Sequence, residues 1–502
     1  MKIGVIIVVA LYEFLSIGIV SWLIRRKKRV QEKEESFALG GRSLSTWAVG
    51  TTMCLTLLGS GHLTGTWEGC LNLGETQIWH VMANGFAMAF GAVTIYCWAR
   101  RMRITTTGEI ATKLYCKELA VLIAAVNIAV GWAVTSFETQ ALGIIISSMT
   151  GFPLKITVLM SSVIGLCYII FGGTRQAAML NQVNIIILYI GMFGTLFFVV
   201  KMLPGFNFHT ITEYYAANAG KYPNFLKFTG GKEHFLQVGI PILIAPFFAH
   251  CCGQQTIQTA ASAKNEKSLK RIAWFVGPMN VIIGVISICI AMTARTMPEF
   301  AEFNNKLVTT QMLITKLPVW FIAILFAAFV AALLSSYGGF LIGPATVITV
   351  DFVKEFYKQD MTQKQETRLI RIFIGIGAII TCMMAQTLPT IVNMFTWIYS
   401  FMIPVFFLFI FGLWWKRNKT VGILAFVVSW IVATIWTFFP NMTKVLHMEN
   451  IHISYIIVLI SLLILVVGNI VTEGEPGYFH SEEWYQSEAY KIYLDEKSKG
   501  NI

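Results

Sequence analysis

Apolar runs close to 20 residues long recur along the whole chain, and they restrict its fold more than any other feature of the sequence. A helix needs about 20 mostly apolar residues to cross a bilayer. The composition agrees, since 56% of the residues are hydrophobic and 13% are charged, whereas soluble domains carry about 25% charged residues. The chain of 502 residues is therefore predicted to be an all-α polytopic membrane protein embedded in the lipid bilayer.

About thirteen transmembrane spans can be drawn through these runs, with boundaries that are good to a few residues. Each is close to the length that a bilayer requires. The predicted spans are 3–24, 46–71, 76–99, 119–149, 154–173, 177–203, 236–260, 271–294, 318–350, 369–388, 390–414, 420–438 and 453–472.

The distribution of Lys and Arg predicts the orientation of the spans. The first run is followed by Arg25–Arg29 and lacks a small-residue cleavage site, so it is predicted to be a retained helix. Basic residues then gather in alternate loops, which is the pattern of loops on the cytoplasmic side. The net charge of +12 is explained in this way and predicts no nucleic-acid partner. We expect a cell (inner) membrane location, with the N-terminus outside and the C-terminus in the cytoplasm.

One predicted span contains helix breakers in its middle. The stretch Leu55–Gly65 includes Gly59, Ser60 and Gly61, and each glycine weakens a helix interior by about 1 kcal/mol. Irregular backbone at membrane depth persists only where protein or a wet cavity satisfies its carbonyl groups. Discontinuous helices of this kind hold substrate and ions in secondary transporters. The alternative is that these glycines allow close helix packing.

The spans divide into two blocks of five, 46–203 and 236–414, and each block opens with a span that carries breakers. In the second block these are Pro241, Pro246 and the run Cys251–Gly253. Because each block has an odd number of spans, the two blocks have opposite orientations, as in inverted repeats. The predicted organisation is an N-terminal helix and basic loop (1–30), a first repeat (37–203), a second repeat (236–416), two C-terminal helices (420–472) and a cytoplasmic tail (473–502).

Six short motifs, in order and well spaced, carry a resemblance to a known family. They are Phe37–Leu44, Arg100–Ile110, Phe171–Thr174, Gln254–Gln258 with Ala263 and Lys264, Ala332–Ser336 running to Asp351–Lys354, and Gly412–Lys416 before Gly422. Together they resemble the sodium:solute symporter family, which includes sodium/glucose, proline, sialic acid and choline carriers. The resemblance implies a five-plus-five inverted repeat (LeuT-like) with broken helices at the midplane.

The resemblance also implies a sodium site. In the family, carbonyl groups of the broken span and an Ala-x-x-Ser-Ser motif supply its ligands; the matching residues here are Leu55, Leu58, Ala332, Ser335 and Ser336. Oxygen ligands suit a hard cation. The alternative is that the two hydroxyls bond back to their own helix.

Two departures from the family pattern bear on that site. Asn181 stands where the family usually has Asp, and Gly339 stands where it often has a further Ser. We therefore expect one sodium ion, held in a weakened electrostatic well.

Glu138 lies in the middle of a predicted span, where a carboxylate is costly and usually functional. It could compensate for the missing Asp, bind a cationic substrate or carry a proton. The alternative is a neutral carboxyl group that is hydrogen-bonded to a neighbouring hydroxyl.

Further substrate-binding candidates follow from matched pocket positions. His80 also lies in a span but matches no such position. The candidates, besides Glu138, are His62, Asn84, His250, Thr396 and Trp397.

The nature of the substrate is restricted in two ways. Gly65–Glu68 resembles the choline-carrier branch, but Leu57 and Gly253 stand where that branch has tryptophans around the ammonium group. Choline is therefore disfavoured, and so is a simple anion, because no Lys or Arg lies near the pocket. A small amine, a zwitterion or a neutral polar solute fits best.

The sequence thus predicts sodium-coupled uptake of a small organic solute by a protein that functions as a monomer. One alternative is a proton-coupled symporter that uses Glu138. Another is a transporter-like membrane sensor, although the tail 473–502 contains no output module. A channel would not need two broken spans at one site. An enzyme is not expected, because the sequence contains neither a nucleophile–base constellation nor a His-Glu-x-x-His motif.

Overall fold

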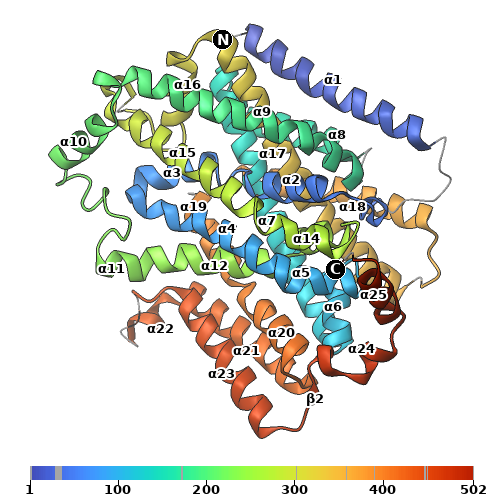
Figure 1. Cartoon of the computed structure of the whole chain (residues 1–502). Coiled ribbons are helices and arrows are strands. Elements are labelled where there is room, and N and C mark those ends of the chain that lie inside the picture. Colours follow the sequence, from blue (N-terminus) through green and yellow to red (C-terminus); the bar gives the residue numbers. More distant parts are fainter. Residues whose placement is uncertain are drawn as a thin grey trace.

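The computed structural model describes residues 3–28, 37–170, 173–300, 302–357, 359–388, 391–445, 448, 450–500 and 502. Long helices form most of it (Figure 1). The long unbroken ones are α1 (Ile3–Lys28), α7 (Lys117–Thr150), α8 (Leu154–Ile170), α9 (Gly173–Met202), α15 (Val276–Thr296), α17 (Val319–Val347), α18 (Gln363–Ala385), α21 (Lys419–Phe438) and α23 (Ile453–Val471).

The remaining elements are shorter pieces, several of which follow one another within a single predicted span. They are α2 (Thr46–Leu57), α3 (Thr64–Leu73), α4 (Ile78–Val93), α5 (Ile95–Arg101), α6 (Thr107–Leu114), α10 (His209–Ala217), α11 (Lys232–His234), α12 (Ile240–Cys252), α13 (Gln254–Ala261), α14 (Glu266–Ile272), α16 (Val308–Lys316), α19 (Ile391–Ser400), α20 (Ile403–Trp414), α22 (Pro440–Val445), α24 (Glu482–Gln486) and α25 (Glu488–Ser498). Short 3₁₀ or π turns are η1 (Gly40–Arg42), η2 (Gly74–Gln77), η3 (Pro204–Phe206), η4 (Phe235–Gly239), η5 (Pro298–Phe300), η6 (Ile348–Lys354) and η7 (Tyr478–His480).

The prediction of a helical membrane protein is confirmed. In the described part of the chain, nine helices are long and apolar enough to cross a membrane, and one bent pair, 64–93 with 95–101, would make a tenth. Each of the thirteen predicted spans falls on a helix or on consecutive helices. The count of thirteen membrane crossings stays a prediction, because several of those segments are short or broken.

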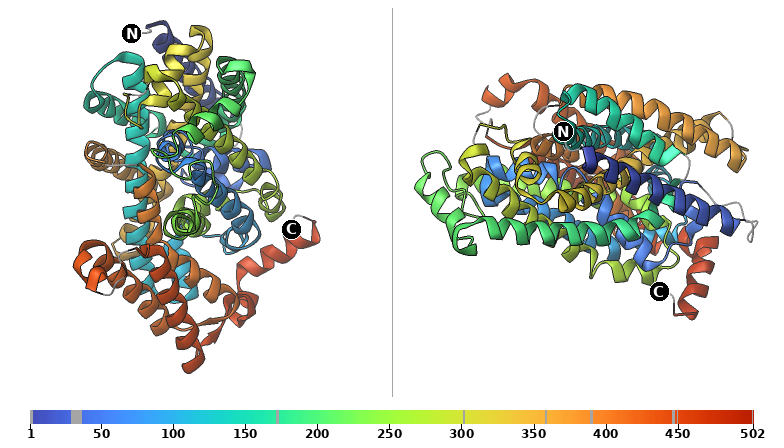
Figure 2. Two further views of the ribbon diagram at one scale, coloured as in Figure 1. Left: turned by 90° about the vertical axis from the view of Figure 1, so that its left-hand side faces the viewer. Right: turned by 90° about the horizontal axis from the view of Figure 1, so that it is seen from above.

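The centre of the molecule is formed by α7 and α17, which pack against each other. Helix α17 also packs on α9 and on α2, so that the first broken span lies against the most buried helix of the bundle. Helix α1 lies along one edge, and α21 and α23 pack together at the opposite edge (Figure 1; Figure 2). This arrangement places the Leu55–Gly65 stretch and the Ala332–Ser336 motif in the interior.

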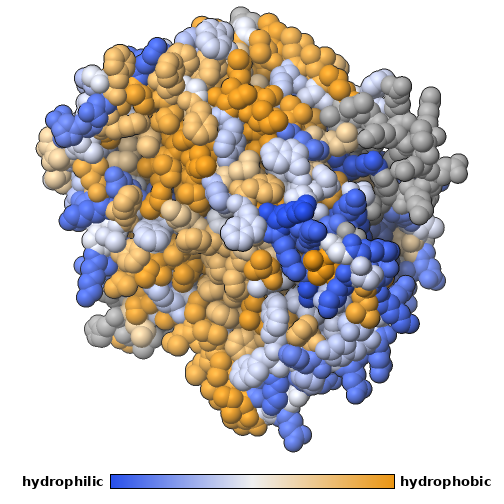
Figure 3. Space-filling model, in the orientation of Figure 1, coloured by the Kyte–Doolittle hydropathy of each residue, from blue (hydrophilic) through white to orange (hydrophobic). Residues whose placement is uncertain are grey.

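The surface divides into an apolar body and polar ends. In Figure 3 hydrophobic residues cover most of the middle, and hydrophilic residues gather at the lower right, where α24 and α25 lie, with a smaller group along the left edge near α10. Exposed apolar side chains such as Ile19, Phe197 and Leu463 belong to the long helices. A broad apolar band of this kind is suited to contact with lipid.

The break predicted in the first span is confirmed, and in the second span the break falls at Gly253, whereas Pro241 and Pro246 lie within the continuous helix α12. Helix α2 ends at Leu57 and α3 begins at Thr64, so the Gly59–Gly61 segment is unwound. In the second case α12 ends at Cys252, and Gly253 adopts an extended conformation (φ −69°, ψ 145°) before α13 begins. These breaks leave carbonyl groups in the membrane interior that are not used by a helix.

Several of the family-like motifs contact one another through hydrogen bonds. Arg42, at a positive φ of 53°, donates hydrogen bonds to the carbonyl groups of Ala261, Arg103 and Ile104. Burial lowers the pKa of its guanidinium group to about 10, so it stays charged at neutral pH. Phe171 and Gly172 lie outside the described residues, whereas Thr174 donates to the carbonyl group of Ala38 at 2.7 Å.

One feature of the C-terminal region was not predicted. The strand β1 (Lys416–Arg417) pairs antiparallel with β2 (Glu475–Pro476), which joins the end of α20 to the tail. Arg100 on α5 forms an ion pair of 2.9 Å with Glu496 on α25. The polar tail therefore packs against the bundle.

Candidate functional site

The break between α2 and α3 faces the Ser-Ser pair of α17. The hydroxyl of Ser336 donates to the carbonyl groups of Leu55 at 2.8 Å and Thr56 at 3.1 Å. It also lies 3.3 Å from the carbonyl of Ala332 on its own helix. The structure therefore brings the matched residues of α2 and α17 together. The bond to its own helix, which was the alternative interpretation, is also present for Ser336.

The hydroxyls of Thr56 and Ser335 have no hydrogen-bond partner within the described ranges. The carbonyl group of Leu58 belongs to the unwound segment that follows α2. All three residues are at most 3% exposed, and buried polar groups of a native structure are normally paired. The set of oxygens, neutral and close to an unwound carbonyl, fits a sodium ion, which would supply the missing partner.

Glu138 of α7 lies at the same break. Its two carboxylate oxygens accept hydrogen bonds from the backbone N–H of Ser60 at 2.9 and 3.1 Å, and Oε1 accepts the Ser60 hydroxyl at 2.8 Å. A Cβ atom added to Gly59 would collide with the carboxylate of Glu138 and with the hydroxyl of Ser336. The lack of a side chain at position 59 therefore leaves room for these two side chains beside the break.

Asn181 of α9 approaches α2 one turn before Leu55. Its side-chain amide donates to the hydroxyl of Thr52 at 3.3 Å. Its Oδ1 atom is buried and has no partner in the described part of the structure. The residue that stands in place of the family's Asp therefore faces the broken helix but brings no charge to it.

A second group contains His62 and Asn84, which were predicted to bind the substrate. It also contains His80 and Phe395, which were not. The ring of His62 lies 3.0 Å from the amide of Asn84 and 5.8 Å, between centroids, from the ring of His80. Phe395 continues this group from α19, at 6.4 Å from His80. His62, His80 and Asn84 are at most 2% exposed, so the group is an enclosed polar and aromatic cluster beside the break.

Of the other predicted substrate residues, His250 and Thr396 lie near this cluster and Trp397 does not. His250 packs against Tyr399, with ring centroids 5.0 Å apart, and Tyr399 lies 5.4 Å from Phe395. Thr396 is buried on the same helix, α19. Trp397 is not brought to the cluster, because its indole N–H donates to the hydroxyl of Thr437 on α21 at 3.0 Å.

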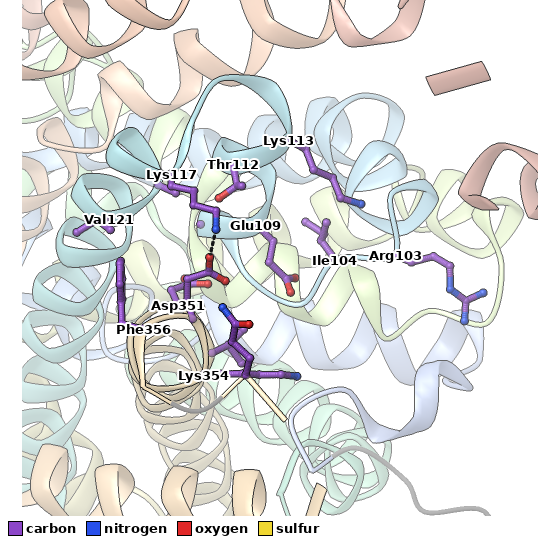
Figure 4. Close-up of a pocket in the computed structure, with 15 residues that line it drawn as sticks. Arg103, Ile104, Glu109, Thr112, Lys113, Lys117, Val121, Asp351, Lys354 and Phe356 are labelled. Atoms are coloured by element: carbon purple, nitrogen blue, oxygen red, sulfur yellow. Dashed lines mark ion pairs between the residues drawn. The ribbon is translucent and has the colours of Figure 1, made fainter. Parts of the chain in front are cut away.

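Two cavities in the described part of the structure are not lined by His62, His80 or Asn84. A cavity of about 30 Å³ is lined by His250, Tyr399, Gln254 and neighbouring residues. A larger one of about 410 Å³ lies where α6, α7 and η6 meet (Figure 4), and none of the predicted site residues lines it. Its lining includes charged side chains, with an ion pair between Lys117 and Glu355 at 2.5 Å and with Asp351 accepting the hydroxyl of Thr106.

Sequence reasoning did not assign a role to Ser60, Thr56, Phe395 or Tyr399. Ser60 could have been found from the sequence, because it stands between two glycines in a broken span. In an unwound segment both its N–H and its hydroxyl are free to donate to a group on another helix. Phe395 and Tyr399 are four residues apart, which places them on one face of a helix. Their contact with histidines of two other helices depends on tertiary structure and has no local signal.

Comparison with solved structures identifies the fold. The fold is similar to that of a Na⁺-coupled sialic acid symporter in a substrate-bound outward-open state, with a TM-score of 0.78 and 16% identity over 94% of this chain and 98% of that one. It is also similar to a nucleobase-cation-symport-1 family transporter in a closed conformation, with a TM-score of 0.55 and 11% identity over 89% and 96% of the two chains. The predicted inverted-repeat transporter fold is thereby confirmed.

The sequence identifies the family. The model of the sodium:solute symporter family matches residues 37–431, and the chain belongs to that family. It is 23% identical over 467 residues to a sodium/glucose cotransporter of Vibrio parahaemolyticus, covering 84% of this chain and 83% of the relative. It is 22% identical over 409 residues to high-affinity choline transporter 1 of Drosophila melanogaster, covering 78% and 64%. The family consists of transporters, so the expectations of a transporter and not an enzyme are confirmed.

Proposed function

We propose that the protein is a secondary active transporter that couples the uptake of a small organic solute to one sodium ion. The observation that carries this proposal is the pair of buried, unpartnered hydroxyls of Thr56 and Ser335 at the helix break that contains Leu58. A bound sodium ion would link the unwound segment to α17, and thereby favour one conformer of the transporter.

The solute site of this proposal is the cluster of His62, Asn84 and His80 with the aromatic rings of α19. Asn84 Oδ1 and His80 Nδ1 are buried without a partner in the described structure, so a solute with polar groups could satisfy them. None of the residues named in this cluster is a Lys or Arg, which disfavours a simple anion. A small amine, a zwitterion or a neutral polar solute remains the proposed class, with His250 and Thr396 at its edge.

The sodium dependence can be tested with the purified protein in liposomes. A thermal-shift screen of amines, amino acids and neutral polar solutes would identify a solute that binds, and this solute is then labelled for the uptake assay. We expect an inward sodium gradient to drive its accumulation, and a proton gradient alone to have little effect. Full uptake under the proton gradient with no effect of sodium would favour the alternative, a proton-coupled symporter that uses Glu138. Solute binding without any counterflow would favour a membrane sensor.

A further inference from the structure

Glu138 is a buried carboxylate at membrane depth, and it lacks a basic partner. It is 2% exposed, and none of the ion pairs between described residues includes it. Its hydrogen-bond donors are the N–H and the hydroxyl of Ser60, which are both neutral. A carboxylate in this position normally pairs with a cation or lines an ion pathway.

The carboxylate of Glu138 and the hydroxyl of Ser336 both lie close to Gly59. A Cβ atom added to Gly59 would stand less than 2.5 Å from the hydroxyl of Ser336 on α17, and 2.5 and 2.7 Å from the carboxylate oxygens of Glu138 on α7. The carboxylate is therefore less than about 5 Å from a hydroxyl of the proposed sodium site. Gly59 itself belongs to the unwound segment between α2 and α3.

We propose that Glu138 supplies the negative charge of the cation site, and that it does so in place of the charge that Asn181 does not provide. The carboxylate faces the ion beside Gly59, while its hydrogen bonds with Ser60 hold its orientation. This inference rests on the proposed sodium-coupled function and assigns Glu138 to the ion and not to the solute. Two opposite charges separated by a few Å attract strongly in a protein interior, so the carboxylate strengthens a site whose other oxygens are neutral.

The test measures sodium binding and not transport. Purified protein in detergent is titrated with sodium chloride at constant ionic strength, with potassium chloride as the replacement salt, and the thermal unfolding temperature is followed. The variants are Glu138→Gln, Ser336→Ala and, as a matched control, Glu13→Gln, which changes another buried carboxyl group, on helix α1 and outside the helix break. We expect Glu138→Gln to raise the half-maximal sodium concentration by about tenfold or more, and Glu13→Gln to behave like the parent.

The outcomes separate this inference from the proposed function. If Ser336→Ala weakens the sodium response and Glu138→Gln does not, the inference is wrong and sodium coupling stands. If the parent shows no sodium response, the proposed function itself fails. Should Glu138→Gln not fold, Glu138→Asp keeps the charge and is expected to retain a sodium response. The double variant Glu138→Gln with Asn181→Asp is expected to restore sodium binding. If neither Glu138→Asp nor this double variant is stabilised by sodium, the role of Glu138 is purely structural.

Discussion

Ser335 and Ser336 are neighbours in sequence, but their hydroxyls have different surroundings. The hydroxyl of Ser336 is shared between carbonyl groups of α2 and of its own helix, whereas the hydroxyl of Ser335 has no partner in the described structure. A hydroxyl that donates one hydrogen bond still has lone pairs for a cation. Both residues can therefore contribute to an ion site, but only Ser336 also ties α17 to the broken helix.

This difference predicts different effects of the two alanine substitutions. Ser336→Ala should lower the stability in the absence of sodium by about 1 kcal/mol, because it removes the hydrogen bonds to Leu55 and Thr56. Ser335→Ala should leave that stability almost unchanged. Both variants should require more sodium for half-maximal stabilisation, without a change in which solute is preferred. Denaturant unfolding with and without sodium would measure both effects, and a normal sodium response of both variants would contradict the assigned site.

The residues of this site could be predicted only in part. The family pattern led to Leu55, Leu58 and the Ser335–Ser336 pair, because those residues stand in motifs with fixed spacing. The bond between Ser60 and Glu138 joins residues 78 positions apart, and no periodicity or spacing reports such a contact. The same holds for Trp397, which matches a pocket position in sequence but is directed toward α21 by its bond to Thr437.

The broken span is the element on which this site is assembled. Its two halves were predictable, because glycines and a serine interrupt an apolar run, but the way in which the break is filled was not. Glu138 from α7 and Ser336 from α17 enter it from different helices. The lack of a side chain at Gly59 is what allows both to approach.

Gly59 and Gly61 offer a matched pair of substitutions within this element. At Gly59 an added methyl group would collide with Ser336 and Glu138, whereas at Gly61 the nearest atom, His80 Nε2, would be at 3.4 Å. We expect Gly59→Ala to abolish sodium-dependent stabilisation and uptake, and Gly61→Ala to keep both within a few-fold of the parent. Sodium titration and uptake at equal amounts of membrane-inserted protein would test this. Equal behaviour of the two variants would show that the close approach at Gly59 is not important.

At the scale of the whole molecule, the fold places polar segments at opposite ends of an apolar body. Helix α10 lies at one end, and the tail helices α24 and α25 lie toward the other (Figure 1). The tail is held there by Arg100 through Glu496 and by Arg417 through Glu483 at 3.1 Å. The alternation of basic loops along the sequence predicts which end faces the cytoplasm, because Lys and Arg are retained on that side.

The predicted orientation can be tested by cysteine labelling in intact cells with a reagent that does not cross the membrane. Asn218, next to α10, and Lys267, on α14, are both exposed, and cysteines at these positions report on the two sides. We expect Asn218→Cys and a cysteine at position 1 to be labelled from outside, and Lys267→Cys and a cysteine at position 502 to be labelled only after the membrane is opened. An odd number of spans requires the two ends of the chain to lie on opposite sides. Labelling of positions 1 and 502 from the same side would rule out thirteen spans. It would also contradict the assignment of residues 37–203 and 236–416 as two repeats, with one helix before them and two helices after them.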